Sequence, residues 1–375
     1  MNAPLRRRPV LRWVAPGAAL AMIIAGSQVA AHWPANASTN LPPRSAAQLL
    51  TNVQRAKPVA LSGTVTAKMS LGLPELPSGV AAGDPTNPIN LLSATHQAKV
   101  WYDGDRSARV AVIGDSAETD LITNTKGLWI WKSADKSVLH IDGPTAKSGG
   151  MPHGPAMQPG SATPNPAQLR TPENVAAWAL KMLDPTTAVT TTSNDRVAGR
   201  AAYELVLTPK TSNTKIGSVR IAIDADHQIP LRAEVFARGA TSPAINVGFS
   251  SISFSKPPAS RFDFTPPPGS KVTNKSAPAA GSHAKQVPEP AKPTTAPKVV
   301  GTAWSSVLVG TTPTSSTANT KNSTLQSALK LLPKVSGSWG SGHLLNTALF
   351  SAVITDDGHF AVGAVQPATL YAALG

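Results

Sequence analysis

The clearest pattern in the chain is an alternation of apolar and polar positions over residues 59–73. One side of this alternation carries Val59, Leu61, Gly63, Val65, Ala67, Met69, Leu71 and Leu73. A period of two is the pattern of a β-strand that buries one face. The stretch is much longer than the roughly five or six residues usual for a strand. It therefore predicts a long strand in a large, curved sheet.

The same alternation recurs in shorter runs that are separated by turn residues. Asp103-Gly104 and the stretch 124–127, which ends in glycine, are typical of β-hairpins. The predicted strands are 96–102, 107–113, 116–123, 128–132, 137–141, 187–192, 200–207, 217–223, 231–238 and 245–254. In the last run the alternation changes phase at Ser250-Ser251, which predicts a β-bulge. Successive hairpins indicate an antiparallel meander.

Two helices are predicted beside these strands. Residues 44–56 have apolar positions at helical spacing, and Ser45 with Gln48 forms a capping box. A second helix is expected from Thr171, where Pro172 takes the first helical position. Its apolar stripe consists of Val175, Trp178, Ala179, Met182 and Leu183. The Gly-, Pro- and Met-rich stretch 143–169 before it is expected to be a mobile loop that could act as a lid.

Changes in composition divide the chain into parts. The main domain is expected at 43–270, and a Pro-, Ala- and Lys-rich linker at 271–298. A small C-terminal α+β domain is expected at 299–375, with a short helix near 325–332 and a last helix over 367–374. Without cysteines or a metal its own core would be marginal, so docking on the main domain is one expectation.

Residues 1–37 have the features of an export signal. Four arginines, the first at Arg6 and the last at Arg12, precede an apolar stretch from Trp13 to about Ala31, and Ala35-Asn36-Ala37 fits a cleavage site. The length lies between a signal peptide and a membrane span, so a cleaved signal and a single-pass anchor are both open. Either interpretation places the remaining chain outside the cytoplasm, secreted to or anchored in the cell envelope.

Composition and charge exclude several classes of function. The chain has no cysteine, which excludes disulfides, thiol catalysis and cysteine-ligated metals. The net charge of +14 is spread along the chain without an aromatic and basic stripe, so nucleic acid is not an expected partner. His140-x-Asp142 and Asp224-x-Asp226-His227 could contribute metal ligands, but polar turn residues explain them better. We expect no enzyme activity, no metal and no cofactor.

The order of these elements resembles a known superfamily over roughly residues 43–270. The motifs are Thr171-Pro172-Glu173, Val197-Ala198-Gly199-Arg200 before Tyr203-Glu204-Leu205, Asp224 through Pro230-Leu231-Arg232, and Phe262-Asp263-Phe264-Thr265-Pro266-Pro267. They are similar to the lipoprotein-carrier superfamily of LolA-like carriers, the regulator RseB and actinobacterial glycolipid-carrying lipoproteins. The resemblance implies a mainly β fold with helices, a half-open antiparallel β-barrel covered by helices, with the small C-terminal α+β domain as an extension.

The same resemblance implies a binding function without catalysis. The expected ligands are acyl chains of a lipid, glycolipid or lipoprotein, exchanged with the cytoplasmic membrane. The alternative is an RseB-type regulator that senses envelope lipids and binds a membrane anti-sigma factor. We expect six residues to line one apolar cavity: Val65, Met69, Trp129, Trp131, Trp178 and Met182. For the tryptophan pair at 129 and 131, a plain aromatic core is an equally good interpretation.

Overall fold

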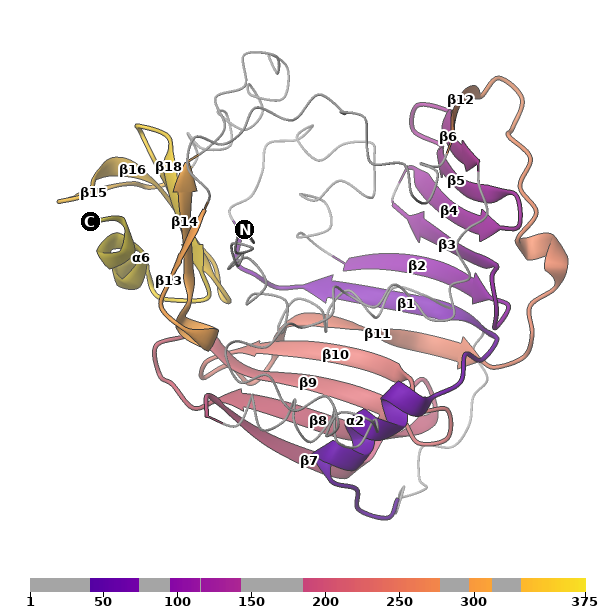
Figure 1. Ribbon diagram of the computed structural model, residues 1–375, viewed down its shortest axis with the longest axis horizontal. Coiled ribbons are helices and arrows are strands. Elements are labelled where there is room, and N and C mark those ends of the chain that lie inside the picture. The colour runs from indigo at the N-terminus through magenta and orange to yellow at the C-terminus, as the bar shows by residue number, and fades with distance from the viewer. Residues whose placement is uncertain (1–40, 74–94, 115, 143–184, 277–296, 312–331) are drawn as a thin grey trace, which may run out of the picture.

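The computed structural model describes residues 41–73, 95–114, 116–142, 185–276, 297–311 and 332–375. These residues form two β-sheets, one of twelve strands and one of six. Figure 1 shows the smaller sheet beside one end of the strands of the larger sheet. No described helix is long and apolar enough to cross a membrane. The basic and apolar start of the chain lies outside the described residues.

Most strands of the large sheet follow one another in space as the meander predicts. Their order is β12 (Lys271–Ser276), β6 (Ser137–Asp142), β5 (Gly127–Lys132), β4 (Glu118–Asn124), β3 (Ala108–Ile113), β2 (Thr95–Tyr102), β1 (Leu61–Met69), β11 (Pro243–Ser253), β10 (Pro230–Ala237), β9 (Ile216–Asp224), β8 (Arg200–Pro209) and β7 (Thr187–Val197). The strands β1–β6 and the strands β7–β11 each follow one another as predicted, whereas β1 lies beside β11 and β12 beside β6. The expected mainly β class is confirmed. The sheet is open, with β12 and β7 at its two edges.

Strand β1 joins the two halves of this sheet. It pairs with β11 from Ser62 to Met69 on one side and with β2 through Leu61 and Tyr102 on the other. The register with β11 shifts between Thr64 and Val65, because one residue of β11, Ser250, has no partner there. The bulge predicted from the phase change at Ser250-Ser251 is therefore confirmed.

The helix expected at 44–56 forms as α2 (Ala46–Arg55). Its capping box is present, because the Ser45 side chain accepts from the backbone of Gln48 and the Gln48 side chain accepts from the backbone of Ser45. Leu49 of α2 packs against β8 and β9. In the part of the chain that the structure describes, α2 is the only α-helix on the large sheet. The second expected helix and the loop before it, residues 143–183, lie outside that part.

The stretch expected to begin the linker forms a strand. Lys271–Ser276 pairs with β6 in register and in parallel, whereas the other neighbours in the large sheet are antiparallel. The sheet is therefore mixed, whereas an antiparallel one was expected. The reason is topological: after β11 the chain passes the strands β1–β5 and then runs along the β6 edge in the same direction as β6. All six residues of β12 are exposed.

The C-terminal part forms its own sheet and helix. Its strands are β13 (Lys298–Val300), β14 (Val307–Thr311), β18 (His359–Gly363), β17 (Ser351–Thr355), β16 (Gly340–Asn346) and β15 (Lys334–Gly337), in that spatial order. Helix α6 (Pro367–Leu374) packs on them, and Val353 and Leu370 are fully buried between. Of the short helix expected near 325–332, all but residue 332 lies outside the described residues.

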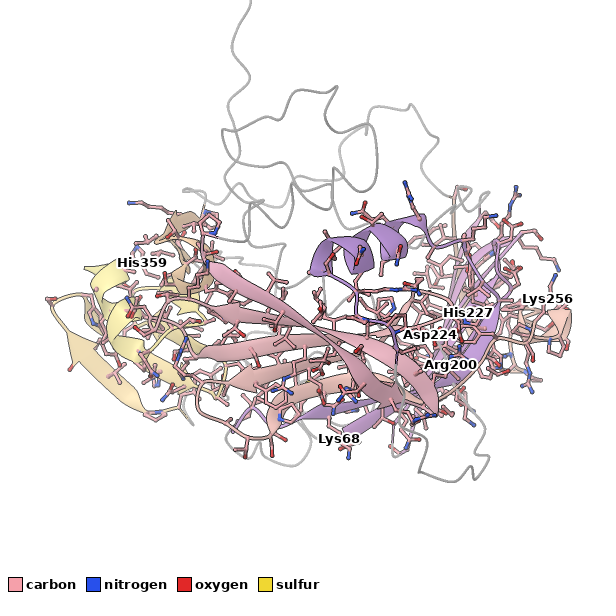
Figure 2. All side chains as sticks on the ribbon, turned by 90° about the horizontal axis from the view of Figure 1, so that it is seen from below. Lys68, Arg200, Asp224, His227, Lys256 and His359 are labelled. Carbon is pink, nitrogen blue, oxygen red and sulfur yellow. The ribbon has the colours of Figure 1, made fainter. Side chains whose placement is uncertain are left out.

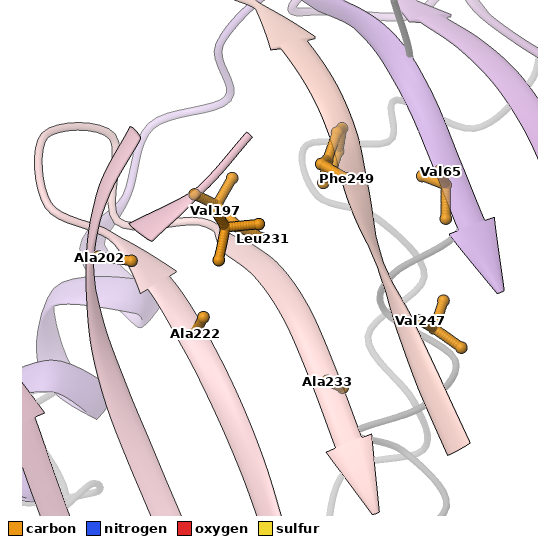
Figure 3. Packing of buried hydrophobic residues seen from close by; sticks show 8 residues of the cluster. All are labelled: Val65, Val197, Ala202, Ala222, Leu231, Ala233, Val247 and Phe249. Carbon is orange, nitrogen blue, oxygen red and sulfur yellow. The ribbon is translucent and has the colours of Figure 1, made fainter. Parts of the chain in front are cut away.

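This C-terminal unit docks on the large sheet. Trp304 and Leu349 enter an apolar cluster with Leu71, Val219 and Val235. The Trp304 indole Nε1 donates to the Thr187 hydroxyl at 2.8 Å. Two further apolar cores lie on the large sheet, one under α2 and one around Val65 and Phe249, shown in Figure 3. Docking of the C-terminal unit agrees with the marginal size of its own core.

Candidate functional site

The register of the ladders assigns side chains to the two faces of the large sheet. We call the face under α2 the helix-side face; it is defined by Tyr203, Leu205 and Ile223, which pack against Leu49. Paired residues of adjacent strands point to the same face. Across the successive strands, Leu205 pairs with Ile221 and Ile221 with Ala233. Ala233 then pairs with Val247, and Val247 with Ala67. Val65 and Met69, two residues either side of Ala67, therefore lie on the helix-side face.

The same tracing places the tryptophan pair on the other face, which we call the outer face. Leu61 lies four residues before Val65 on β1, so both side chains point to the same face, and Leu61 pairs with Tyr102. On the next strands Tyr102 pairs with Ala108, Ala108 with Thr123, and Thr123 with Leu128. Leu128 is thus on the helix-side face, and Trp129 and Trp131 point away from it.

The structure does not bring the expected cavity residues into one space. Val65 and Met69 lie on the helix-side face, whereas Trp129 and Trp131 lie on the outer face. A period of two shows which residues of a strand share a face, but it does not show which face holds a ligand. Trp178 and Met182 lie outside the described residues.

The segment that follows β11 packs on the outer face around the tryptophan pair. Trp129 stacks on His140, with ring centroids 3.5 Å apart, and lies 5.5 Å from the ring of Phe264. The Asn124 side chain donates to the Phe262 carbonyl at 2.9 Å. We call residues 262–267 the closing segment. Its contacts agree with the interpretation of Trp129 as part of an aromatic core.

A polar pocket of about 620 Å³ lies between the closing segment and the strands, and Trp131 lines it. Beside Trp131, Asp120 is 2% exposed and forms an ion pair with Arg109. Burial raises the pKa of Asp120 to about 6; Arg109 opposes this increase, and the nearby charge of Glu118 adds to it. This pocket is charged, unlike the apolar cavity that we expected.

The helix-side face of the β3–β6 half is apolar and only half-buried. Its side chains, found by the same tracing, are Val110, Val112, Leu121, Leu128, Ile130, Leu139 and Ile141. Leu121 is 36% exposed. On the outer face of the same strands, Ile122 and Val138 are at most 1% exposed. The outer face of this half therefore combines buried apolar residues with charged ones such as Arg109 and Asp120, whereas the helix-side face carries a row of half-buried apolar residues.

A buried carboxylate organises the turn between β9 and β10. Asp224 is fully buried, and its side chain accepts hydrogen bonds from Arg200 and from the backbone N–H groups of Asp226 and His227. Burial raises the pKa of Asp224, but these hydrogen bonds and the charge of Arg200 outweigh it and hold the pKa below its ordinary value. Figure 2 shows Arg200, Asp224 and His227 close together at one end of the sheet.

The three side chains that could bind a metal ion here are Asp224, Asp226 and His227, whose ligand atoms lie within 4.8 Å of one another. Arg200 pairs with both carboxylates, at 2.8 Å for Asp226, and lies 3.3 Å from the His227 Nδ1. The guanidinium already supplies the positive charge that these groups require. This cluster therefore fits the role of polar turn residues, as expected from the sequence.

A basic pocket of about 620 Å³ lies beside this turn, at the C-terminal end of α2. Four of its lining side chains are basic: Arg44, Arg55, Lys57 and His227. The sequence offered one signal, since basic residues stand at both ends of the predicted helix 44–56. This signal alone does not identify the pocket, because the turn that completes the pocket is far away in the sequence.

No family model matches the sequence, and no curated protein matches it. Solved structures are similar at low identity. A complex of Pseudomonas aeruginosa MucA and MucB matches over 88% of this chain and 96% of that chain, with a TM-score of 0.39 and 13% identity. A LolA superfamily protein from Nitrosomonas europaea matches over 59% of this chain and 99% of that chain, with a TM-score of 0.20 and 10% identity. The likeness is to the LolA/RseB-like fold named from the sequence, and it concerns the fold alone.

Proposed function

We propose that this chain is an envelope protein that binds an acyl chain of a lipid, glycolipid or lipoprotein. The ligand would lie on the helix-side face of β3–β6. The observation that carries the proposal is the row of half-buried apolar side chains on that face, with Leu121 36% exposed. Helix α2 contacts β7 and β8, at the other end of the sheet.

Physical chemistry favours a ligand for such a face. Neighbouring apolar side chains that stay partly in contact with water gain free energy when an apolar ligand covers them. Each CH₂ of an acyl chain moved out of water gains about 0.8 kcal/mol, so a sixteen-carbon chain gains on the order of 12 kcal/mol. The bilayer offers nearly the same gain, so a chain can move between membrane and protein at little cost. That exchange is what a carrier needs, and it requires no catalytic group.

The proposed place of action is outside the cytoplasm, at the outer side of the cytoplasmic membrane. The basic and apolar start of the sequence supports it, because positive charge is retained inside during export. A reporter that is active only in the cytoplasm, fused after residue 375, should then give no signal.

The decisive experiment changes two exposed large apolar residues of the described part of the chain, one on each face. Leu121 lies on the helix-side face, and Val272, which is 44% exposed, pairs with Val138 on the outer face. Leu121→Glu should weaken binding of a fluorescent fatty acid by about tenfold or more, because it places a charge against the acyl chain. Val272→Glu is the matched control and should bind like the wild type. Thermal unfolding of both variants checks that they are folded.

Two results would contradict the proposal: no fatty-acid binding by the wild type, or unchanged binding by the folded Leu121→Glu variant. Native mass spectrometry of the gently extracted protein gives an independent test. A bound lipid supports a carrier, whereas a bound membrane protein without lipid supports the regulatory alternative.

A further inference from the structure

We infer that the basic pocket at the end of α2 binds a phosphate group, carried by the ligand whose acyl chain lies on the helix-side face. This inference rests on the proposed function and adds the chemistry of the headgroup. The pocket has a volume of about 620 Å³, more than a phosphate alone requires. The remaining space would accommodate the glycerol or sugar that carries the phosphate.

The charges of the pocket favour an anion. Arg44, Arg55 and Lys57 bring three positive charges from the two ends of one helix. Asp226 is the acidic residue of the lining, and it pairs with Arg200 at 2.8 Å, which offsets its charge. The C-terminal end of a helix carries roughly half a negative charge, which is small against three cations. An arginine binds phosphate with two parallel hydrogen bonds, so this set suits a phosphate well.

Arg44 is held in place before any ligand arrives. Its guanidinium donates to the Gln228 side chain at 3.0 Å and lies 4.8 Å from the centroid of the Tyr203 ring. Its carbonyl accepts from the Thr191 hydroxyl at 2.8 Å. A cation fixed in this way loses little side-chain entropy when it binds an anion. Arg55 and Lys57 are exposed and can close over the ligand.

The pocket also adjoins apolar residues of the helix-side face. Ala225 lines the pocket and packs in the cluster between α2 and the sheet. Pro58 and Val59 line it too, and they lead directly into β1. A phosphate held here would therefore lie where polar surface meets the apolar face. This is the arrangement that a lipid with a phosphate headgroup requires.

The test compares two lipids with the same acyl chain, a lysophosphatidic acid and a monoacylglycerol, on the full-length protein. The wild type should bind the phosphate lipid on the order of tenfold more tightly, because charge-assisted hydrogen bonds form only with the phosphate. Arg55→Glu with Lys57→Glu should abolish this preference, because it weakens binding of the phosphate lipid far more than binding of the monoacylglycerol. The matched control is Lys68→Glu with Lys256→Glu, which changes the net charge equally at two exposed residues outside the pocket lining, labelled in Figure 2, and should keep the preference.

Soluble probes separate the headgroup from a free anion. Glycerol 3-phosphate should bind the wild type and not the Arg55→Glu, Lys57→Glu variant. If inorganic phosphate at equal concentration displaces the glycerol 3-phosphate, the pocket recognises the phosphate group alone. If inorganic phosphate does not displace it, the pocket recognises the whole headgroup. Either result supports an anion site. If the wild type binds glycerol 3-phosphate through these charges but binds neither lipid, the anion site is supported and the acyl-chain proposal is refuted. The inference is overturned if the wild type does not prefer the phosphate lipid to the monoacylglycerol. It is also overturned if the Arg55→Glu, Lys57→Glu variant keeps this preference.

Discussion

At the scale of single residues, the most constrained group is the carboxylate of Asp224. It has no exposed surface, yet it is charged, because Arg200 and two backbone N–H groups replace the water it has lost. Arg200 in turn lies 4.7 Å from the centroid of the Phe254 ring, and His227 stacks on the same ring. One buried charge thus ties β8, the β9–β10 turn and the end of β11 together.

Replacing Asp224 with Asn should lower the free energy of unfolding by about 3–5 kcal/mol at pH 7, the usual cost of breaking a buried ion pair. The effect depends on pH in a defined direction. Because the folded pKa lies below the ordinary value of 3.8, the stabilisation is present above about pH 4 and is lost as the pH falls through the folded pKa. Urea unfolding of the wild type and variant at pH 7 and pH 3 should show the two curves converging in acid.

Asp226→Asn is the control for this prediction. The Asp226 side chain is 78% exposed, so its pairing with Arg200 is screened by solvent and should contribute little. Equal losses of stability in the two variants would show that burial of Asp224 is not the cause.

At the scale of secondary-structure elements, the outer face of β2–β6 depends on the closing segment. Phe262 is 5% exposed, and Phe264 lies beside Trp129. After this segment the chain adds β12 to the edge of the sheet. The closing segment thus takes the place that a covering helix would have on this face.

Truncation of Trp129 to Ala should therefore act on stability and not on ligand binding. Removing the ring leaves a cavity beside His140 and Phe264, at a cost of about 3 kcal/mol in the free energy of unfolding. Fatty-acid affinity should stay within about twofold of the wild type, because the ring points away from the helix-side face. Paired thermal unfolding and binding measurements check this. A lost affinity at unchanged stability would place the ligand on the outer face.

Local patterns in the sequence were enough to predict some elements. The β1 alternation, the capping box of α2 and the bulge at Ser250 each depend on neighbours in the chain. The capping box and the bulge are confirmed, and β1 forms but covers only nine of the fifteen residues 59–73 over which the alternation predicts a strand. Strand β12 has no such pattern, because all its side chains are exposed and its partner β6 lies more than a hundred residues earlier. For the same reason the basic pocket, completed by the β9–β10 turn, could not be read from the helix alone.

At the scale of the whole molecule, the C-terminal unit is tied to the large sheet by both apolar and polar contacts. Trp304 is 9% exposed in the shared cluster. The Ala348 N–H donates to the Leu71 carbonyl at 2.8 Å, and the Lys215 N–H donates to the Ala364 carbonyl at 2.7 Å. The side chain of Lys215, 7% exposed, donates to Asn346 and to the Thr347 carbonyl. The two units should therefore remain together even when the connection between them is cut.

Limited proteolysis tests this. The Pro-, Ala- and Lys-rich composition of residues 277–296 predicts the first cuts there. The two fragments should elute together in gel filtration. Trp304→Ala should separate them, because the lost indole removes about 3–5 kcal/mol of packing from the shared cluster. Wild-type fragments that elute apart would show that the contacts in the structure are too weak to hold the units.

The pairing of β1 with β11 also has a consequence for how the chain acquires its fold. The second strand of that ladder ends at Ser253, so the central ladder cannot form until nearly the whole main domain is available. Ladders between such distant segments form slowly, in milliseconds to seconds, because loop closure precedes any gain from contacts. A chain that crosses a membrane unfolded would benefit from this delay. In such a chain the central ladder would form, and the two halves of the sheet would join, only after β11 had followed β1 to the other side.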